Sequence, residues 1–360
     1  MRGTAAPRRI QDDEQAVFAT IAAGAAEADA GHRDLSADMA LLATSGILRR
    51  LCAVADPADH VDLLRRIGAA SLPVGRLAEG HMNAMRLIAI YGTPAQRCAH
   101  AAEALNGRVY GVWGADDDPP VELRVHHDGR LILAGSKRFA SGLKIVSRAI
   151  LPVGTPEGPR LVITNVADAR RADQSVWQTS GMRATVSGRY DFDGLEAEPL
   201  GGAGDYLREP YFQGGVWRYA AVHVGGLEAL AEAVRRAVRG FGDAANEAQL
   251  HRVARVAGLA HGARLFVTDA ACRVEAPSAG EEDVALSLAA RETVETACLE
   301  AMALADRALG TRSFVTGHPV DLLRRDLGFF LRQADLDGKL RRVGRTLCES
   351  RKPIGAIWSD

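Results

Sequence analysis

Residues 107–154 read GRVYGVWGADDDPPVELRVHHDGRLILAGSKRFASGLKIVSRAILPVG, and this stretch decides the fold. Short apolar runs such as Leu131–Leu133 and Ala149–Leu151 are separated by turn signals at Asp128-Gly129 and Pro152. Such runs between Gly, Pro and Asp residues predict short β-strands. The same pattern continues to Asp205, so the middle of the chain is predicted to be a β-domain.

Helical patterns flank this β-domain on both sides. Alanine-rich stretches fill residues 12–104, and Thr93-Pro94 combines a capping hydroxyl with a proline at the first helical position. Beyond Asp205, apolar residues recur every three or four positions from Val224 to Val238, and two long helices are expected at 246–273 and 283–309. Shorter helices are expected within 319–350.

These patterns together predict the fold class and the domains. We expect a mostly helical α+β protein with an N-terminal helical domain at 1–105, a central β-barrel-like domain at 106–205 and a C-terminal four-helix bundle at 206–360. Residues 1–13 contain arginine and small residues but no apolar core, so we expect a short tail and no signal peptide.

Composition limits the function. The 360 residues include 44 Lys and Arg against 45 Asp and Glu, a net charge of -1 that favours neither nucleic acid nor an anionic membrane. No apolar run is long enough to span a bilayer. The five cysteines are widely spaced without a CxxC pair, which indicates reduced thiols in a cytoplasmic protein and no zinc site.

Common catalytic and nucleotide-binding motifs are absent from the sequence. It contains no GxGxxG after a strand, no GxxxxGK[ST], no HExxH and no GxSxG. The adjacent His126 and His127 precede Asp128-Gly129 and are interpreted as part of a solvated hairpin rather than as metal ligands. We therefore predict no metal.

The order of domains and four local stretches resemble the acyl-CoA dehydrogenase superfamily, which includes related flavin monooxygenases. The first stretch, Lys137 to Gly142, is similar to the strand beside the flavin ring. The resemblance implies that Phe139 lies against the ring, that Ser141 bonds its edge, and that Trp113 belongs to the same site. Fixed donors at that edge stabilise the negative charge that develops when a flavin accepts a hydride.

The other three stretches extend the resemblance over residues 60–350. Trp177 and the segment 181–193 are similar to the closing strands of the β-domain. Phe241-Gly242 with Gln249 resembles a segment that reaches a neighbouring subunit's FAD, and Arg239 is the candidate for the pyrophosphate. Gly310 and Thr311, with the helix from His318, resemble a turn beside the neighbour's cofactor.

The usual catalytic carboxylate is missing. An acyl-CoA dehydrogenase needs a base over the α-carbon of its substrate, which much of the family places eight residues after an Arg-Asp pair. Ala334 occupies that position after Arg325-Asp326. A second family position is occupied by Trp217, followed by Arg218, and we place these two residues in the substrate site. Asp335 and Asp337 remain as candidates, followed by Glu209 and Asp205.

The resemblance leaves several functions open. It implies an FAD-dependent, or alternatively FMN-dependent, oxidoreductase acting on an acyl-CoA thioester or another small molecule. The alternatives are a two-component flavin monooxygenase, which needs no such base, and a homologue that kept the fold and lost the chemistry. The implied partners are further copies of the chain, as a dimer or tetramer, and an electron-transfer flavoprotein or a flavin reductase.

Overall fold

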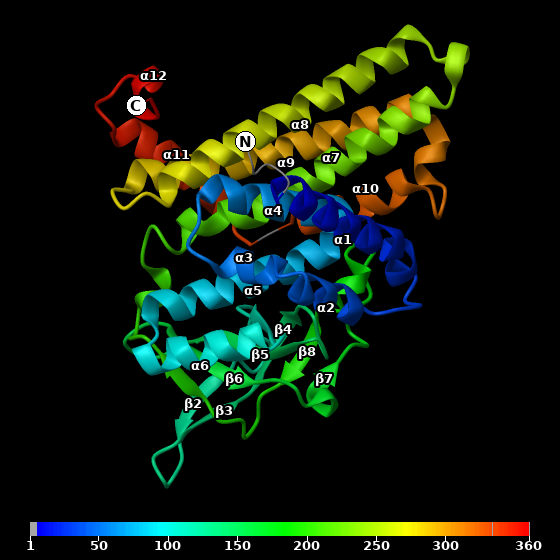
Figure 1. The fold of residues 1–360 in the computed structure, drawn as a ribbon. Coiled ribbons are helices and arrows are strands. Elements are labelled where there is room, and N and C mark those ends of the chain that lie inside the picture. The colour runs from blue at the N-terminus through cyan, green and yellow to red at the C-terminus, as the bar shows by residue number, and fades with distance from the viewer. Residues whose placement is uncertain (1–5, 333, 360) are drawn as a thin grey trace. The chain divides into compact units, whose positions relative to one another are not determined.

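The computed structural model of the chain describes residues 6–332 and 334–359 (Figure 1). Contacts divide the chain into two compact units. The first unit contains residues 1–54, 76–179 and 183–206, and the second contains 55–75, 180–182 and 207–360. The predicted fold class is confirmed: helices form both ends of the chain, and the strands lie in its middle.

Five helices belong wholly or mainly to the first unit. Their bounds are α1 Ala6–Asp29, α2 Ser36–Thr44, α3 Ile47–Cys52, α5 Leu72–Tyr91 and α6 Pro94–Leu105. The predicted start of α6 is confirmed, because Thr93 and Gln96 form a reciprocal capping box around Pro94. Residues 6–13, which we predicted to be a tail, are instead the first turns of α1, and Pro7 is compatible with that position. Residues 1–5 lie outside the described part of the chain.

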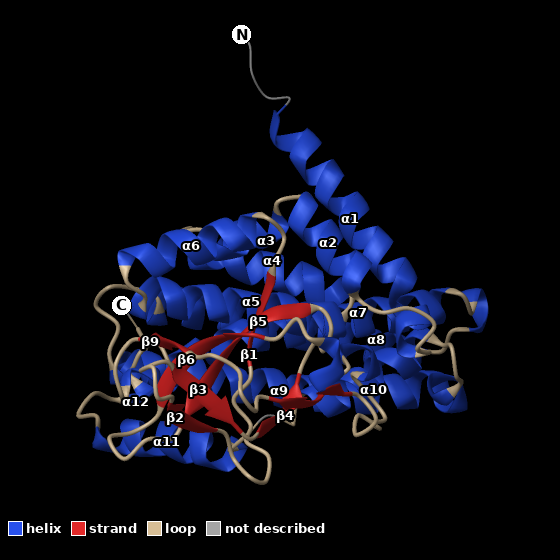
Figure 2. Ribbon diagram, turned by 90° about the horizontal axis from the view of Figure 1, so that it is seen from below, coloured by secondary structure: helices blue, strands red, loops and turns tan. Residues whose placement is uncertain are grey.

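The strands of the first unit form three small sheets. Their bounds are β1 Val109–Val112, β2 Glu122–Val125, β3 Leu131–Ala134, β4 Ser136–Ala140, β5 Val146–Val153, β6 Arg160–Asn165, β7 Ala172–Asp173, β8 Gly188–Asp191 and β9 Glu198–Leu200. One sheet has the order β1-β5-β6-β9, another is the hairpin β2-β3, and the third has the order β4-β8-β7 (Figure 2). His126 and His127 lie in the turn of the hairpin, as predicted.

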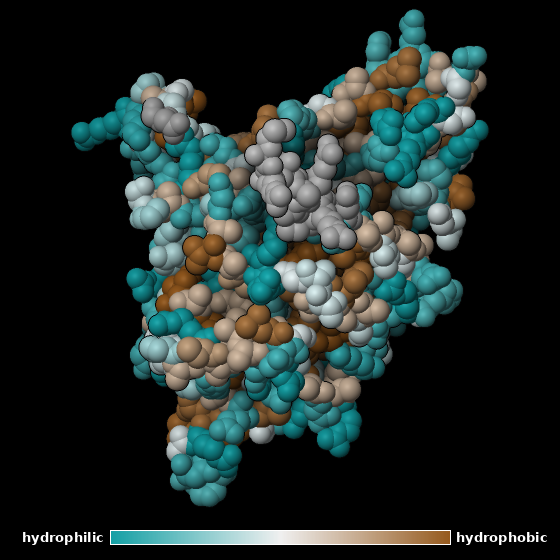
Figure 3. Space-filling view, in the orientation of Figure 1, coloured by the Kyte–Doolittle hydropathy of each residue, from teal (hydrophilic) through white to brown (hydrophobic). Residues whose placement is uncertain are grey.

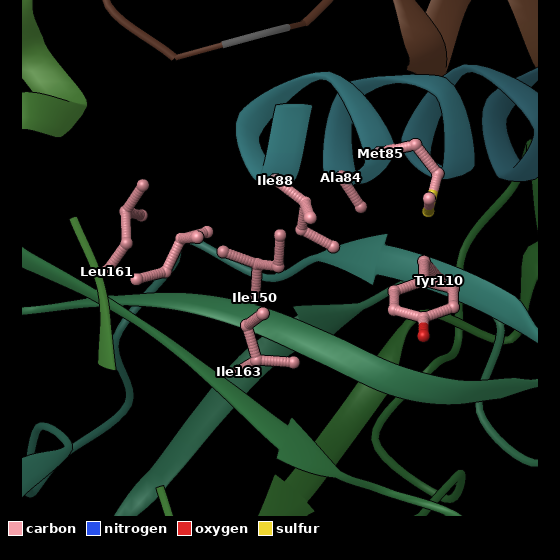
Figure 4. Close-up of a cluster of buried hydrophobic side chains, with 8 residues drawn as sticks. Ala84, Met85, Ile88, Tyr110, Ile150, Leu161 and Ile163 are labelled. Atoms are coloured by element: carbon pink, nitrogen blue, oxygen red, sulfur yellow. The ribbon is translucent and has the colours of Figure 1, made fainter. Parts of the chain in front are cut away.

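The core of the first unit lies between α5 and the four-stranded sheet. Ala84, Met85 and Ile88 on α5 point toward buried side chains of the sheet, among them Tyr110 and Ile150 (Figure 4). The backbone N–H of Tyr110 donates to Nδ1 of His81, which is also buried on α5. Burial lowers the pKa of His81 to about 4, so this histidine is neutral and can accept the bond.

The second unit is helical. Its helices are α4 Pro57–Ala70, α7 Trp217–Arg239, α8 Glu247–Val274, α9 Glu281–Leu309, α10 Pro319–Phe330, α11 Leu336–Glu349 and α12 Ile354–Ile357. The three long predicted helices are confirmed as α7, α8 and α9. Their apolar stripes pack against one another, with Val224, Leu227 and Val234 of α7 fully buried.

Helix α4 packs along α7 at very short range, although the two are far apart in sequence. A Cβ atom added at Gly68 would overlap the carbonyl oxygen of Val222, and one added at Gly225 would overlap that of Arg65. The two glycines therefore let the backbones touch. The sequence pattern did not indicate this contact, because glycine inside a helix gives no apolar periodicity.

Candidate functional site

Phe139 is the most unusual residue of the β-domain. Strand β4 pairs with β8 in antiparallel register, and this register breaks between Lys137 and Ala140. Phe139 lies in the break with φ 54°, a left-handed backbone conformation that bulky residues rarely adopt. Its side chain is 52% exposed. An exposed aromatic ring on strained backbone is typical of a ligand site, because folding alone would not favour either feature.

Two neighbours flank the exposed ring. Trp177 meets Phe139 edge to face, with ring centroids 6.2 Å apart and an interplanar angle of 84°. The guanidinium of Arg138 lies 5.4 Å from the centre of the Phe139 ring. The site thus has two aromatic rings and a cation close together on the surface of the first unit, of which sequence reasoning had placed only Phe139 in the site.

Trp113 fixes the turn that follows Phe139. Its buried indole N–H donates to the carbonyl oxygen of Ser141 at 3.0 Å. The indole packs against Tyr190 and Phe192 of the β8 region, with ring centroids 5.5 and 6.3 Å away. Trp113, Phe139 and Ser141, which the sequence predicted to act together, are therefore brought to one place, but Trp113 supports the site from inside.

A chain of hydroxyl groups ends at Ser141. The Ser187 hydroxyl donates to Oγ of Ser141 at 2.8 Å, and Thr185 Oγ1 lies 2.7 Å from Ser187 Oγ. Ser187 donates its one hydroxyl hydrogen to Ser141. The hydrogen bond between Thr185 and Ser187 is therefore donated by Thr185. The hydrogen of Ser141 then has no acceptor among the described residues. Ser141 can donate it to a ligand beside Phe139.

Lys137 anchors the loop on the other side of β4. Its ammonium group is fully buried and bonds Asp116 Oδ1 at 2.5 Å and the carbonyl oxygen of Pro152 at 2.9 Å. Burial lowers the pKa of Lys137, while Asp116 opposes that shift. This ion pair between the buried Lys137 and the exposed Asp116 holds the chain after Trp113 against β4 and so stabilises the shape of the site.

A second group of predicted residues gathers at one end of the second unit. Gln249 donates from its side-chain amide to Ala308 O at 3.0 Å, which ties the start of α8 to the end of α9. Gly310, with φ 60°, begins the 3₁₀ turn Gly310–Phe314 that contains Thr311. Arg312 in this turn lies over the Phe241 ring at 5.3 Å.

Arg239 lies at the same end, in the last turn of α7. Its side chain is exposed and forms no hydrogen bond or ion pair with any residue that the structure describes. Arg239 precedes Phe241 by two residues, and Phe241 meets the turn that contains Gly310 and Thr311 through Arg312. Sequence reasoning missed Arg312, although its stretch was quoted, because only the structure places it on Phe241.

The turn between α10 and α11 carries the position of the missing base. Ala334 is exposed, and its carbonyl oxygen accepts a hydrogen bond from Lys339. Asp335 has φ 54° and its carboxylate folds over Gly338, while Asp337 lies in the first turn of α11. Both aspartates are exposed, which is an ordinary arrangement for the start of a helix and a poor environment for a desolvated base. Glu209 is engaged too, accepting from the backbone N–H groups of Gln213 and Gly214.

Trp217 and Arg218 are buried at the start of α7. The Trp217 indole N–H and Nη1 of Arg218 both donate to Oε1 of Glu275, at 3.0 and 3.1 Å. Trp217 is 1% exposed and Arg218 is 6% exposed. Glu275 closes the end of α8 and neutralises Arg218, so this pair of predicted substrate residues belongs to a closed ionic contact inside the second unit.

The described residues hold neither a metal-binding cluster nor a membrane-spanning helix. No three His, Cys, Asp or Glu side chains there are arranged to hold a metal ion. Within the same residues, no helix combines the length and the apolar character that a membrane span requires.

Comparison of the sequence finds no match, whereas comparison of the structure finds proteins of similar fold. No protein-family model matches the chain, and neither does any curated protein. The structure is similar to the FMN-bound dibenzothiophene monooxygenase TdsC from Paenibacillus sp. A11-2, with a TM-score of 0.81 and 18% identity over 98% of this chain and 100% of that one. It is also similar to butyryl-CoA dehydrogenase from Megasphaera elsdenii, with a TM-score of 0.80 and 16% identity over 97% and 99% of the two chains.

A third similar structure is the methanesulfinate monooxygenase MsuC from Pseudomonas fluorescens, with a TM-score of 0.76 and 19% identity over 97% of this chain and 99% of that one. The chain therefore has the acyl-CoA dehydrogenase-like fold, which these dehydrogenases and flavin monooxygenases share. At such low identity the likeness extends to the fold and leaves the activity open.

Proposed function

We propose that this chain of acyl-CoA dehydrogenase-like fold is a flavin-dependent oxidoreductase, and that its reaction is an oxygenation. The main support for flavin binding is the exposed, strained Phe139 beside Ser141, whose hydroxyl hydrogen is available to a ligand. The ring face suits stacking against an isoalloxazine, and the hydroxyl suits the polar edge of the same group.

Phe139, Trp177 and Ser141 would hold the flavin ring on the first unit, while Trp113 and Lys137 keep their strands in place. A bound flavin supplies the electron transfer that protein side chains cannot carry out. The donor chain from Thr185 through Ser187 to Ser141 supports this arrangement, because it orients a hydrogen toward the ligand without a charged group. The guanidinium of Arg138 would favour negative charge nearby.

For the phosphate part of the cofactor, we propose the end of the second unit that carries Arg239. Its uncommitted guanidinium suits a phosphate, and Gln249, Gly310 and Thr311 belong to elements at the same end of the unit. By analogy with the fold, this end would serve the cofactor of a second copy. A pyrophosphate contact at Arg239 would favour FAD, which contains a pyrophosphate, over FMN, which does not; TdsC was solved with FMN.

Oxygenation is favoured over dehydrogenation because no carboxylate is in place to remove an α-proton. Ala334 replaces it at one family position, and Trp217 and Arg218 are locked to Glu275 at the other. A positioned base contributes roughly 10² to 10⁴ in rate, so its loss is hard to reconcile with efficient dehydrogenation. Oxygenation takes both electrons from reduced flavin, places one atom of O₂ in the substrate and releases the other as water.

The proposed partners follow from this reaction. A separate flavin reductase would supply electrons, where a dehydrogenase would pass them to an electron-transfer flavoprotein. We propose a second copy of the chain against α8 and α9, whose exposed faces carry Leu250, Leu265 and Leu299. Brown, apolar atoms lie among teal ones over α8 at the upper right of Figure 3. Five free cysteines support a reducing, cytoplasmic location.

The test begins with flavin binding and then separates the two reactions. The purified chain, titrated with FAD and with FMN, is expected to quench flavin fluorescence with at least one of them. With reduced flavin supplied by a reductase it should consume O₂ in the presence of a small aromatic or sulfur-containing substrate, and acyl-CoA thioesters should not bleach it without air. Anaerobic bleaching by an acyl-CoA would establish dehydrogenation instead, and failure to bind either flavin would leave only the fold.

A further inference from the structure

A cleft in the second unit lies beside the turn that carries Asp335 and Asp337. It has a volume of about 520 Å³ and is bounded by the start of α9 and one face of α11. Figure 1 shows α11 near the C-terminus, beside the beginning of α9. Pockets for small molecules usually have volumes of about 300 to 1,000 Å³, so this cleft can hold a small ligand.

Three arginines line the α11 side of the cleft: Arg341, Arg342 and Arg345. Positions 338, 341, 342 and 345 follow the three- and four-residue spacing of one helix face, which begins at Gly338. Gly338, at the first of these positions, has no side chain, and the carboxylate of Asp335 folds over that space. The guanidinium groups therefore share one wall.

The acidic residues on the opposite wall are already paired. Arg342 donates to both oxygens of Glu281, at 2.8 and 2.7 Å, and also to Glu209. These carboxylates raise the pKa of Arg342. Glu282 accepts from Lys352 at 2.6 Å and from Ser350 at 3.1 Å. Arg342, Glu281 and Glu282 are thus already engaged in ion pairs within the protein.

Arg341 and Arg345 are different, because both are exposed and neither forms a hydrogen bond or ion pair with a residue that the structure describes. The remaining uncommitted charge of the lining is Glu349, which follows Arg345 by one helical turn. Arg342 shares its single charge between Glu281 and Glu209, so the lining and its ion-pair partners carry no net charge, and Arg341 and Arg345 are the guanidinium groups of the lining that remain available to a ligand.

We propose that this cleft binds a small molecule through a phosphoryl group held by Arg341 and Arg345. A phosphate offers several acceptor oxygens and up to two negative charges, which match two planar guanidinium forks. The open cleft leaves room for the organic part of such a ligand. The site is separate from Arg239, which lies at the other end of the long helices of the same unit.

The experiment is a calorimetric titration of the full chain with inorganic pyrophosphate at low ionic strength. The double variant Arg341→Gln/Arg345→Gln is expected to weaken binding by at least roughly tenfold, because it removes two charge-assisted contacts. Two controls bracket this result. Arg49→Gln removes an exposed arginine of the first unit, and Arg124→Gln removes an exposed arginine of β2; both should retain the binding that depends on Arg341 and Arg345.

Glu349→Gln tests whether the cleft prefers an anion or a cation. Removing this uncommitted anion should tighten pyrophosphate binding by roughly twofold to fivefold, whereas a cleft built for a cation would respond in the opposite direction. Unchanged binding in the double variant, or no binding by the wild-type chain, would overturn the proposal. Thermal unfolding of each variant checks that these exposed substitutions leave the fold intact.

Discussion

The indole N–H of Trp113 and the carbonyl oxygen of Ser141 are joined by a hydrogen bond of 3.0 Å inside the first unit. This bond connects the end of β1 with the turn after β4, and the proposed ligand face lies on that turn. Support and contact are thus divided between the two residues, which makes their roles separable by mutation.

Trp113→Phe should keep the aromatic packing and lose this one bond. We expect the free energy of unfolding to fall by about 1 to 3 kcal/mol, because a partly buried carbonyl loses its donor, and flavin affinity to fall by roughly tenfold. Urea unfolding and flavin fluorescence quenching measure the two effects. Trp358→Phe is the control, since its indole bonds Glu282 O in the second unit; equal loss of flavin affinity there would contradict a local role for Trp113.

Phe139→Gly should separate stability from binding. Glycine tolerates the φ of 54° that strains phenylalanine, so we expect the free energy of unfolding to rise by about 1 kcal/mol. The same variant should bind flavin more weakly. Lys144→Gly is a matched control, since Lys144 has φ 70° and is exposed. That control should gain stability and keep its flavin affinity. A parallel loss of stability and binding in Phe139→Gly would show that the ring serves the fold.

Glu275→Gln tests the closed contact around Trp217 and Arg218. Removing one partner of a buried ion pair leaves an uncompensated charge, and we expect a loss of about 3 to 5 kcal/mol in the free energy of unfolding. Glu232→Gln, which breaks exposed pairs with Arg235 and Arg236, should cost less than about 1 kcal/mol. A small effect at Glu275 would mean that Arg218 is solvated and free to meet a substrate.

The buried His81 predicts a pH dependence. Its pKa in the folded chain is lowered to about 4 from an ordinary value of 6.5, so the unfolded chain binds the proton more tightly. The contribution of neutral His81 is complete above pH 6.5 and is lost as the pH falls toward 4, by at most about 1.4 kcal/mol per pH unit.

His81→Asn should flatten this pH profile, because an amide oxygen can still accept from Tyr110 N–H and does not titrate in that range. Urea unfolding between pH 7 and pH 4 provides the measurement. His251→Asn, at an exposed position of α8, should leave the wild-type profile unchanged. A profile that stays as steep in His81→Asn would assign the acid sensitivity to other groups.

The sequence was most informative where the determinants of structure are local. The cap at Thr93, the strands of residues 109–200 and the long helices depend on neighbouring residues and on periodicity, and the structure confirms them. Phe139 and Ser141 are two residues apart, so their proximity was also readable. Trp113 joined them through the resemblance alone, since its bond to Ser141 spans 28 positions.

Contacts between distant parts of the chain could not be predicted from the sequence. No sequence pattern near Arg218 indicates its contact with Glu275, which lies 57 positions later. Trp177 likewise meets Phe139 only because of the turns between them. The positive φ of Phe139 was equally hidden, because its cause is a break in strand register and not a residue type that favours such a conformation.

The glycine contact between α4 and α7 has a practical consequence for dissecting this protein. A fragment that begins at the end of the β-domain would contain α7 without α4, leaving bare the surface around Gly225 on which α4 belongs. Such a fragment would aggregate or recruit a surrogate helix. Residues 55–75 would have to be grafted onto it, or co-expressed with it, for the helical unit to be purified by itself.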